Sequence, residues 1–241
     1  MPAVADPPVH QRPGSPQVPS PPLSLDSVAD PAAEPRPMLE QRVLLEGVSW
    51  ETFRALRDEP ANDHIRMTYD RGRLELLMTV SSSHGEVSSL LGFLIEQFLS
   101  ETDRDWRGLG DFTVEGEDVA RSLEGDESYY IANVEAIRGK TRIDFDAGDP
   151  VPDLSVEVVV SNPMLDKPAV YAALGVRELW TWRNDAVTVR TLSPEGAYEE
   201  SEDSPSLPGF PFAATVDLLR RRAELTKPEL RRAFLAALSG E

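Results

Sequence analysis

The spacing of apolar residues changes between a helical and an extended pattern several times after residue 39. The clearest helical stretch follows Ser83, and its apolar positions recur every three or four residues: Val87, Leu90, Leu91, Leu94, Phe98 and Leu99. Ser83 and Glu86 have the residue types and spacing of a capping box, so we expect this helix to begin at Ser83. Shorter helices are predicted after Ser49, over residues 167–174 and after Thr226.

Other stretches have the alternation and the β-branched residues that are typical of strands. Two predicted hairpins turn at Asp70-Arg71-Gly72 and at Asn184-Asp185. Further strands are expected at residues 106–115, 127–132 and 152–161. Strands and helices therefore follow one another along the chain, and this order favours an α/β fold with a mixed β-sheet flanked by helices.

The first 38 residues have neither pattern. They contain 11 of the 21 prolines and no aromatic residue. A segment of this composition buries too little apolar surface to fold by itself. We therefore expect a disordered, proline-rich arm over residues 1–38, followed by a single domain over residues 39–241.

Composition and charge exclude several classes of protein. The chain has no cysteine, which excludes a disulfide scaffold, a zinc ribbon and a thiol nucleophile. Its net charge of −18 argues against a broad surface that attracts nucleic acid, although a local basic site is compatible with it. No apolar run approaches the roughly 18 residues of a membrane-spanning helix, and the start of the chain does not resemble a secretory signal. We expect a cytoplasmic protein with no membrane partner.

One acidic residue stands out because its neighbours are apolar. Glu157 lies in the predicted strand 152–161, between Val156 and Val158. If helices cover both faces of the sheet, the carboxylate is buried, and burial is costly unless the charge is paired. The partner is then either a lysine or arginine in an ion pair, or a metal ion at a functional site.

Geometry limits which other acid can share a site with Glu157. Asp153 is four residues away on the same strand, about 13 Å at the rise of an extended chain, so the two carboxylates cannot easily bind one ion. Asp126 directly precedes the predicted strand 127–132. It is a better partner, because it comes from a different element.

Six segments carry a resemblance to a known family: SWETF (49–53), GRLELLMTVSSSHGEV (72–87), EGDESYYI (124–131), IRGKTRID (137–144), PDLSVEVVVS (152–161) and DKPAVYAALGVRELW (166–180). Together they resemble the Uma-type restriction-endonuclease-like proteins, a bacterial family of the PD-(D/E)XK nuclease superfamily. The resemblance covers roughly residues 45–215, and its specificity lies in the order and spacing of the segments. It implies a restriction-endonuclease-like fold for the domain.

The resemblance also implies the residues of an active site. Asp126 and Glu157 match the two metal-binding acids, which would hold one Mg²⁺ ion, with Mn²⁺ as a substitute. The superfamily's usual lysine, two residues after the second acid, is replaced here by Val159. Lys167 matches the lysine that this family is thought to take from the following helix.

Two further residues are candidates for the same site. Asp153 fills the acidic position at the start of the strand, either outside the metal's own ligands or as the first acid in a different alignment. His84 matches the start of the long helix, where a structural or peripheral role competes with a catalytic one.

The implied function is a Mg²⁺-dependent endonuclease that hydrolyses DNA phosphodiester bonds. DNA would be the partner, and a homodimer would supply two sites for cutting both strands. Two alternatives stay open. One is a nuclease-fold binding or regulatory module without catalysis, which the net charge and Val159 favour. The other is a metal-dependent hydrolase of a smaller phosphate ester.

Overall fold

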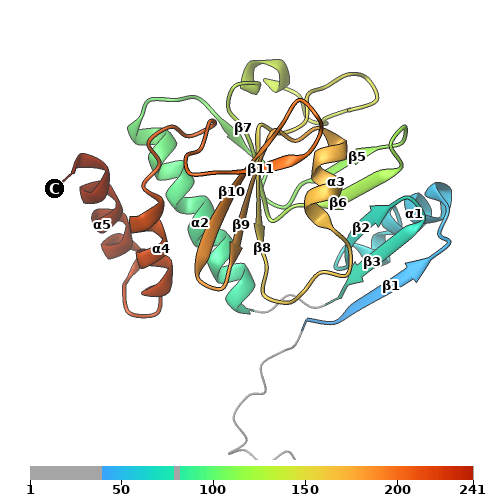
Figure 1. Cartoon of the computed structure of the whole chain (residues 1–241), viewed down its shortest axis with the longest axis horizontal. Helices are drawn as coiled ribbons and strands as arrows, with labels where there is room; N and C mark the ends of the chain where they lie inside the picture. Colours follow the sequence, from blue (N-terminus) through green and yellow to red (C-terminus); the bar gives the residue numbers. More distant parts are fainter. Residues whose placement is uncertain (1–39, 79–81, 241) are drawn as a thin grey trace, which may run out of the picture. The chain divides into compact units, whose positions relative to one another are not determined.

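The strands form two sheets in the computed structural model, which describes residues 40–78 and 82–240 (Figure 1). The arm predicted for residues 1–38 lies outside the described residues. In the first sheet every neighbouring pair is antiparallel, in the order β1-β3-β2-β6-β5. Its strands are β1 (Arg42–Glu46), β2 (Arg66–Asp70), β3 (Arg73–Leu77), β5 (Thr113–Gly116) and β6 (Arg121–Glu124).

The second sheet has the order β11-β10-β9-β8-β7-β4 and is mixed, because β8 and β9 are parallel while the other pairs are antiparallel. Its strands are β4 (Arg107–Gly108), β7 (Glu127–Tyr130), β8 (Leu154–Val158), β9 (Glu178–Arg183), β10 (Ala186–Leu192) and β11 (Tyr198–Ser201). A mixed sheet with flanking helices confirms the α/β class predicted from the sequence.

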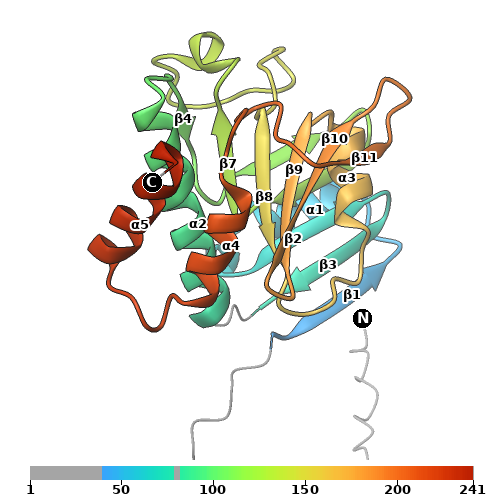
Figure 2. The same ribbon diagram turned by 60° about the vertical axis from the view of Figure 1, so that its left-hand side comes forward.

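Helices cover both faces of the second sheet (Figure 2). The long helix α2 packs against β8 on one face, and α4 and α5 pack against α2. Helix α3 lies on the other face, where it contacts β5, β6 and β11. The helices and 3₁₀ turns are α1 (Trp50–Arg57), η1 (Pro60–Asn62), α2 (Ser82–Glu101), η2 (Val134–Ile137), α3 (Lys167–Leu174), α4 (Phe212–Arg220) and α5 (Lys227–Ser239).

Local capping explains where three of the helices begin. The Ser49 side chain accepts a hydrogen bond from the Thr52 amide at 3.2 Å, and α1 begins at the next residue. The Asp166 side chain accepts a hydrogen bond from the Ala169 amide at the start of α3. The helix ends before Gly175, which has the left-handed conformation with φ of 82°. Thr226 begins α5 with a capping box. The helices predicted after Ser49, over residues 167–174 and after Thr226 are confirmed.

Two local predictions are wrong. Ser83 does not precede the long helix, because α2 already includes Ser82, and the Glu86 side chain instead pairs with Arg222 at 3.1 Å. The stretch 106–115 is not one strand. The chain turns at Gly110, where φ is +61°, so β4 joins the second sheet and β5 joins the first.

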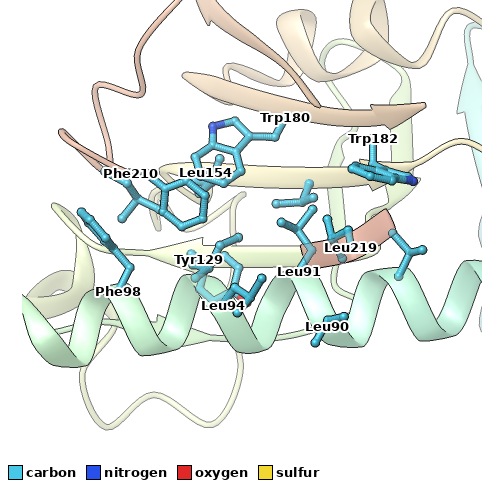
Figure 3. Packing of buried hydrophobic residues seen from close by; sticks show 14 of the residues in the cluster. Leu90, Leu91, Leu94, Phe98, Tyr129, Leu154, Trp180, Trp182, Phe210 and Leu219 are labelled. Carbon is cyan, nitrogen blue, oxygen red and sulfur yellow. The ribbon is translucent and has the colours of Figure 1, made fainter. Parts of the chain in front are cut away.

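The main core lies between α2 and the second sheet (Figure 3). Leu91 and Leu94 of α2 are fully buried against strand residues that include Tyr129, Leu154 and Trp180. This packing fixes β7 and β8 against a rigid helix. All five residues of β8 are buried, so the opposite face of this strand, with Ser155 and Glu157, is covered as well.

Candidate active site

Asp126 is held at the point where the chain enters β7. Its amide donates to the Val156 carbonyl at 3.2 Å, and its Oδ2 accepts from the Val158 amide at 2.6 Å. These two bonds fix the carboxylate against β8. Its other oxygen, Oδ1, accepts from His84 Nε2 at 2.8 Å and from the Arg66 guanidinium. The residue is 4% exposed.

Glu157 is the buried acid of β8, and α3 binds both of its carboxylate oxygens. Lys167 Nζ lies 2.7 Å from Oε2, and the Tyr171 hydroxyl donates to Oε1 at 2.5 Å. Lys167 and Tyr171 are four residues apart, so they lie on one side of α3 and reach the same carboxylate. The predicted cluster of Asp126, Glu157, Lys167 and His84 is thus assembled by β7, β8, α3 and α2.

Burial and neighbouring charges act differently on the two acids. Burial raises the pKa of Asp126, but the hydrogen bond from His84 and the charges of Lys167, His84 and Arg66 outweigh burial and lower the pKa to about 2. Glu157 has a raised pKa, because its burial and the negative charge of Asp126 outweigh Lys167 and Tyr171. The negative charge of Asp126 thus acts on Glu157 and favours its protonated form.

Close packing joins α3 to the chain just before Asp126. A Cβ atom added at Gly125 would lie 2.7 Å from the Tyr171 hydroxyl, closer than such atoms come in folded proteins. Glycine is therefore the residue that lets this hydroxyl reach Glu157. Tyr171 itself is fully buried.

Outer residues hold the cluster in place. Glu40 lies 3.3 Å from His84 Nδ1, so the imidazole bridges Glu40 and Asp126. Glu75 of β3 accepts from the amides of Met164 and Leu165 at 2.7 and 2.8 Å. Glu75 therefore anchors the segment that leads into α3 and indirectly places Lys167.

Asp153 lies apart from the cluster. Its carboxylate accepts from the amides of Ile131 and Asn133 at 2.8 and 2.9 Å, and from the Asn133 side chain at 2.6 Å. These bonds shape the turn that follows β7. Among the described residues, the partners of this carboxylate are therefore structural, and they lie at the opposite end of β8 from Glu157.

A groove of about 480 Å³ reaches Asp126 from the solvent. Arg66, His84, Asp126 and Glu127 line it, together with Gly85, Ser88 and Gly92 along α2 and Lys227 beyond. Glu157 and Lys167 do not line the groove. A second cavity, of about 540 Å³, lies beside Asp153 and contains neither acid of the pair.

The donor set matches magnesium better than a transition metal. Within residues 40–78 and 82–240, no group of three or more histidine and acidic side chains is arranged to hold a metal ion. Mg²⁺ needs fewer protein ligands, since it commonly takes one or two carboxylates and completes its shell with water and substrate phosphate. Within the described residues, Asp126 Oδ2 and both oxygens of Glu157 accept one hydrogen bond each, so each keeps a lone pair. These oxygens are therefore the ones that could serve as protein ligands of a Mg²⁺ ion.

Sequence reasoning missed Arg66, which contacts Asp126, and it gave Glu75 only as a weaker candidate for the metal site. Both follow the alternation of the hairpin β2–β3, in which Thr68 and Glu75 are direct partners and Arg66 lies two residues before Thr68. Met67 and Tyr69 occupy the apolar face. The alternation therefore predicts a polar face that carries Arg66 and Glu75, but only the tertiary structure turns that face toward Asp126 and α3.

Comparison with known proteins agrees with the resemblance of the sequence. The pattern of the Uma2 family, described as "Putative restriction endonuclease", matches residues 50–218. Among solved structures, the chain is similar to a protein of Anabaena variabilis ATCC 29413 described as a putative nuclease belonging to DUF820, with 16% sequence identity, a TM-score of 0.47, and coverage of 79% of this chain and 99% of that chain. None of the curated proteins matches the chain. Because the family pattern spans well over half of its length, this protein belongs to the Uma2 family.

Proposed function

We propose that this protein is a Mg²⁺-dependent endonuclease that hydrolyses DNA phosphodiester bonds. The observation that carries the proposal is the pair of buried carboxylates, Asp126 and Glu157, on neighbouring strands with Lys167 bonded to the second. Membership of the Uma2 family, described as "Putative restriction endonuclease", supports the choice of reaction and of DNA as the substrate.

In this proposal each residue of the cluster has a distinct task. Asp126 and Glu157 would hold Mg²⁺, which when bound would lower the pKa of its water ligands and neutralise charge on the phosphate. Lys167 would orient the attacking water and stabilise developing negative charge, replacing the lysine that Val159 cannot supply. His84 would hold the orientation of Asp126 through its 2.8 Å contact.

One observation favours a nuclease-fold module without catalysis. Arg66 and Lys167 already neutralise the two carboxylates, and such pairing satisfies buried acids with no metal present. A module of this kind would bind no divalent cation at the pair. Metal affinity therefore separates the two functions.

The proposal is tested with supercoiled plasmid, linear duplex, single-stranded and branched DNA, each with Mg²⁺, with Mn²⁺ or with chelator. We expect the wild type to cut at least one substrate only with metal. Glu157→Gln and Lys167→Met should lose at least about a hundredfold in rate, while Glu195→Gln on an exposed turn should match the wild type. Cleavage that survives Glu157→Gln, or a wild type that binds metal and cuts nothing in the panel, would contradict the proposal.

A further inference from the structure

Among the lysine and arginine residues of the described chain, Arg66 is the one that both lines the groove and contacts Asp126. It begins β2 in the first sheet, and its guanidinium crosses to Asp126 Oδ1 in the second. Its side chain is 22% exposed, whereas that of Lys167 is 13% exposed and lies outside the groove. Burial alone would lower the pKa of Arg66, but the charges of Asp126 and Glu124 raise it above its ordinary value. Arg66 is therefore always charged.

Arg66 and His84, which both line the groove, contact the same oxygen of Asp126. This oxygen is Oδ1, while Oδ2 is bonded to the Val158 amide of β8. A cation that enters through the groove would therefore meet a carboxylate already neutralised by a guanidinium. Two positive groups so close to one carboxylate repel each other, so each weakens the binding of the other.

We propose that Arg66 is an exchangeable counter-ion of the active site. It neutralises Asp126 until a divalent cation binds, and it then turns to a phosphate group of the nucleic-acid substrate in the groove. This inference rests on the proposed function, because it takes Asp126 as a metal ligand.

The surroundings of Arg66 allow this exchange. Its Nε lies 3.3 Å from Glu124 and its Nη2 lies 4.0 Å from Asp111, whose side chain is 68% exposed. When the bond to Asp126 is lost, these acids still hold the guanidinium at the groove. The planar guanidinium is also the side chain best suited to bind phosphate through two hydrogen bonds.

The need for a phosphate-binding group is evident from the charge of the protein. With a net charge of −18, the molecule cannot attract DNA through its overall field. Among the described residues, one arginine, Arg66, and one lysine, Lys227, line the groove, and Lys227 Nζ lies 5.2 Å from the centre of the Phe93 ring. Arg66 is the one that lies beside the carboxylate pair.

The first test is a calorimetric titration of Mn²⁺ into Arg66→Gln. If the guanidinium competes with the metal, its removal should tighten Mn²⁺ binding about tenfold, which is the opposite of the usual effect of damage to a site. Arg190→Gln is the matched control, because Arg190 pairs with Glu200 at 25% exposure on β10 and should leave the affinity unchanged. Affinity in Arg66→Gln that is equal to or weaker than that of the wild type would overturn the proposal.

The second test measures the binding of a short labelled DNA duplex in Ca²⁺ by fluorescence anisotropy. Arg66→Gln should bind this duplex about tenfold more weakly despite its tighter metal site. The slope of log affinity against log salt concentration should fall by about one, which corresponds to one lost phosphate contact. Arg66→Lys, which keeps the charge without the fork, should bind with intermediate affinity. DNA affinity in Arg66→Gln equal to that of the wild type would overturn the phosphate role.

A Glu157→Gln variant separates failure of this inference from failure of the proposed function. If Glu157→Gln binds Mn²⁺ as well as the wild type does, the carboxylate pair is not the metal site, and both ideas fall. If Glu157→Gln loses the metal while Arg66→Gln gains no affinity, the metal site stands and only the role of Arg66 is wrong.

Discussion

At the scale of single residues, the hydroxyl of Tyr171 connects the two strands that carry the acids. It donates to Glu157 at 2.5 Å and would collide with any side chain at Gly125, the residue before Asp126. The hydroxyl is therefore positioned by close packing on one side and by a charged hydrogen-bond acceptor on the other. Its effect on the site can be tested by substituting either Tyr171 or Gly125.

Tyr171→Phe removes the hydroxyl, and Gly125→Ala should displace it. We expect each variant to weaken Mn²⁺ binding about tenfold, because residues that orient a metal ligand commonly contribute that much. Calorimetry of both variants and of the double variant forms a thermodynamic cycle. The double variant should be no weaker than Tyr171→Phe alone, and fully additive losses would show that Gly125 acts by another route.

Asp153 gives the contrasting case, a buried acid whose partners among the described residues are structural. Asp153→Asn should lower the free energy of unfolding by about 2 kcal/mol, because it weakens three hydrogen bonds to a charged acceptor. Urea unfolding would measure this loss. Mn²⁺ affinity should stay at the wild-type value. Loss of Mn²⁺ binding in Asp153→Asn would instead show that Asp153 is a metal ligand.

At the scale of elements, the placement of α3 depends on a strand of the other sheet. Glu75 of β3 bonds to the amides of Met164 and Leu165, and the same carboxylate pairs with Arg42 of β1. The first sheet thus holds the segment that leads to Lys167. This explains how a helix of only eight residues can present a lysine at a defined place.

Glu75→Ala should release this segment. Two buried amides and Arg42 would lose their acceptor, so we expect a loss of about 3 kcal/mol in the free energy of unfolding. Hydrogen exchange over residues 160–174 should accelerate more than exchange in α2. Glu46→Ala, at an exposed position of β1, is the control, and equal exchange in both variants would contradict the anchoring role.

At the scale of the whole molecule, one groove residue should shape the pH dependence of stability. Burial and the nearby charge of Glu96 raise the pKa of Glu127 from 4.5 to about 7. At pH values between 4.5 and 7, the native state therefore holds a proton on Glu127 that the unfolded chain has released. The stability that this proton provides is present below pH 4.5 and is lost as the pH rises through 7.

Glu127→Gln removes this pH dependence. The full pKa shift corresponds to about 3 kcal/mol, and solvent screening of this partly exposed side chain reduces it. Relative to the wild type, the variant should therefore gain about 2 kcal/mol in the free energy of unfolding between pH 4.5 and pH 8. Urea unfolding across this range would measure the difference. Glu195→Gln should follow the wild type, and parallel curves for Glu127→Gln and the wild type would contradict the assignment.

Much of the local structure could be predicted, because it depends on neighbouring residues. Ser49, Asp166 and Thr226 cap helices through bonds within a few positions, and the hairpin turns contain Gly72, Asn184 and Asp185, which are residue types that accept positive φ. The division into two sheets could not be predicted, since strand pairing depends on contacts far apart in the sequence.

The described helices include none with the length and apolar character that a membrane span requires.

The candidate site was predictable only in part, again because it depends on contacts far apart in the sequence. Glu157 is evident as an acid within an apolar strand, and the resemblance to the family supplies Asp126 and Lys167. Arg66 and Glu75 lie on a polar strand face whose partners are about 60 and 90 residues away in the chain, and no local pattern reveals such partners.

The most direct test of the account is the titration of Mn²⁺ into the wild type and Glu157→Gln. The account predicts one ion per chain, with micromolar to millimolar affinity in the wild type and no measurable binding in the variant. A thermal unfolding curve for each protein would show that both are folded. Equal binding by the two proteins, or no binding by either, would contradict the central claim that Asp126 and Glu157 form a metal-dependent active site.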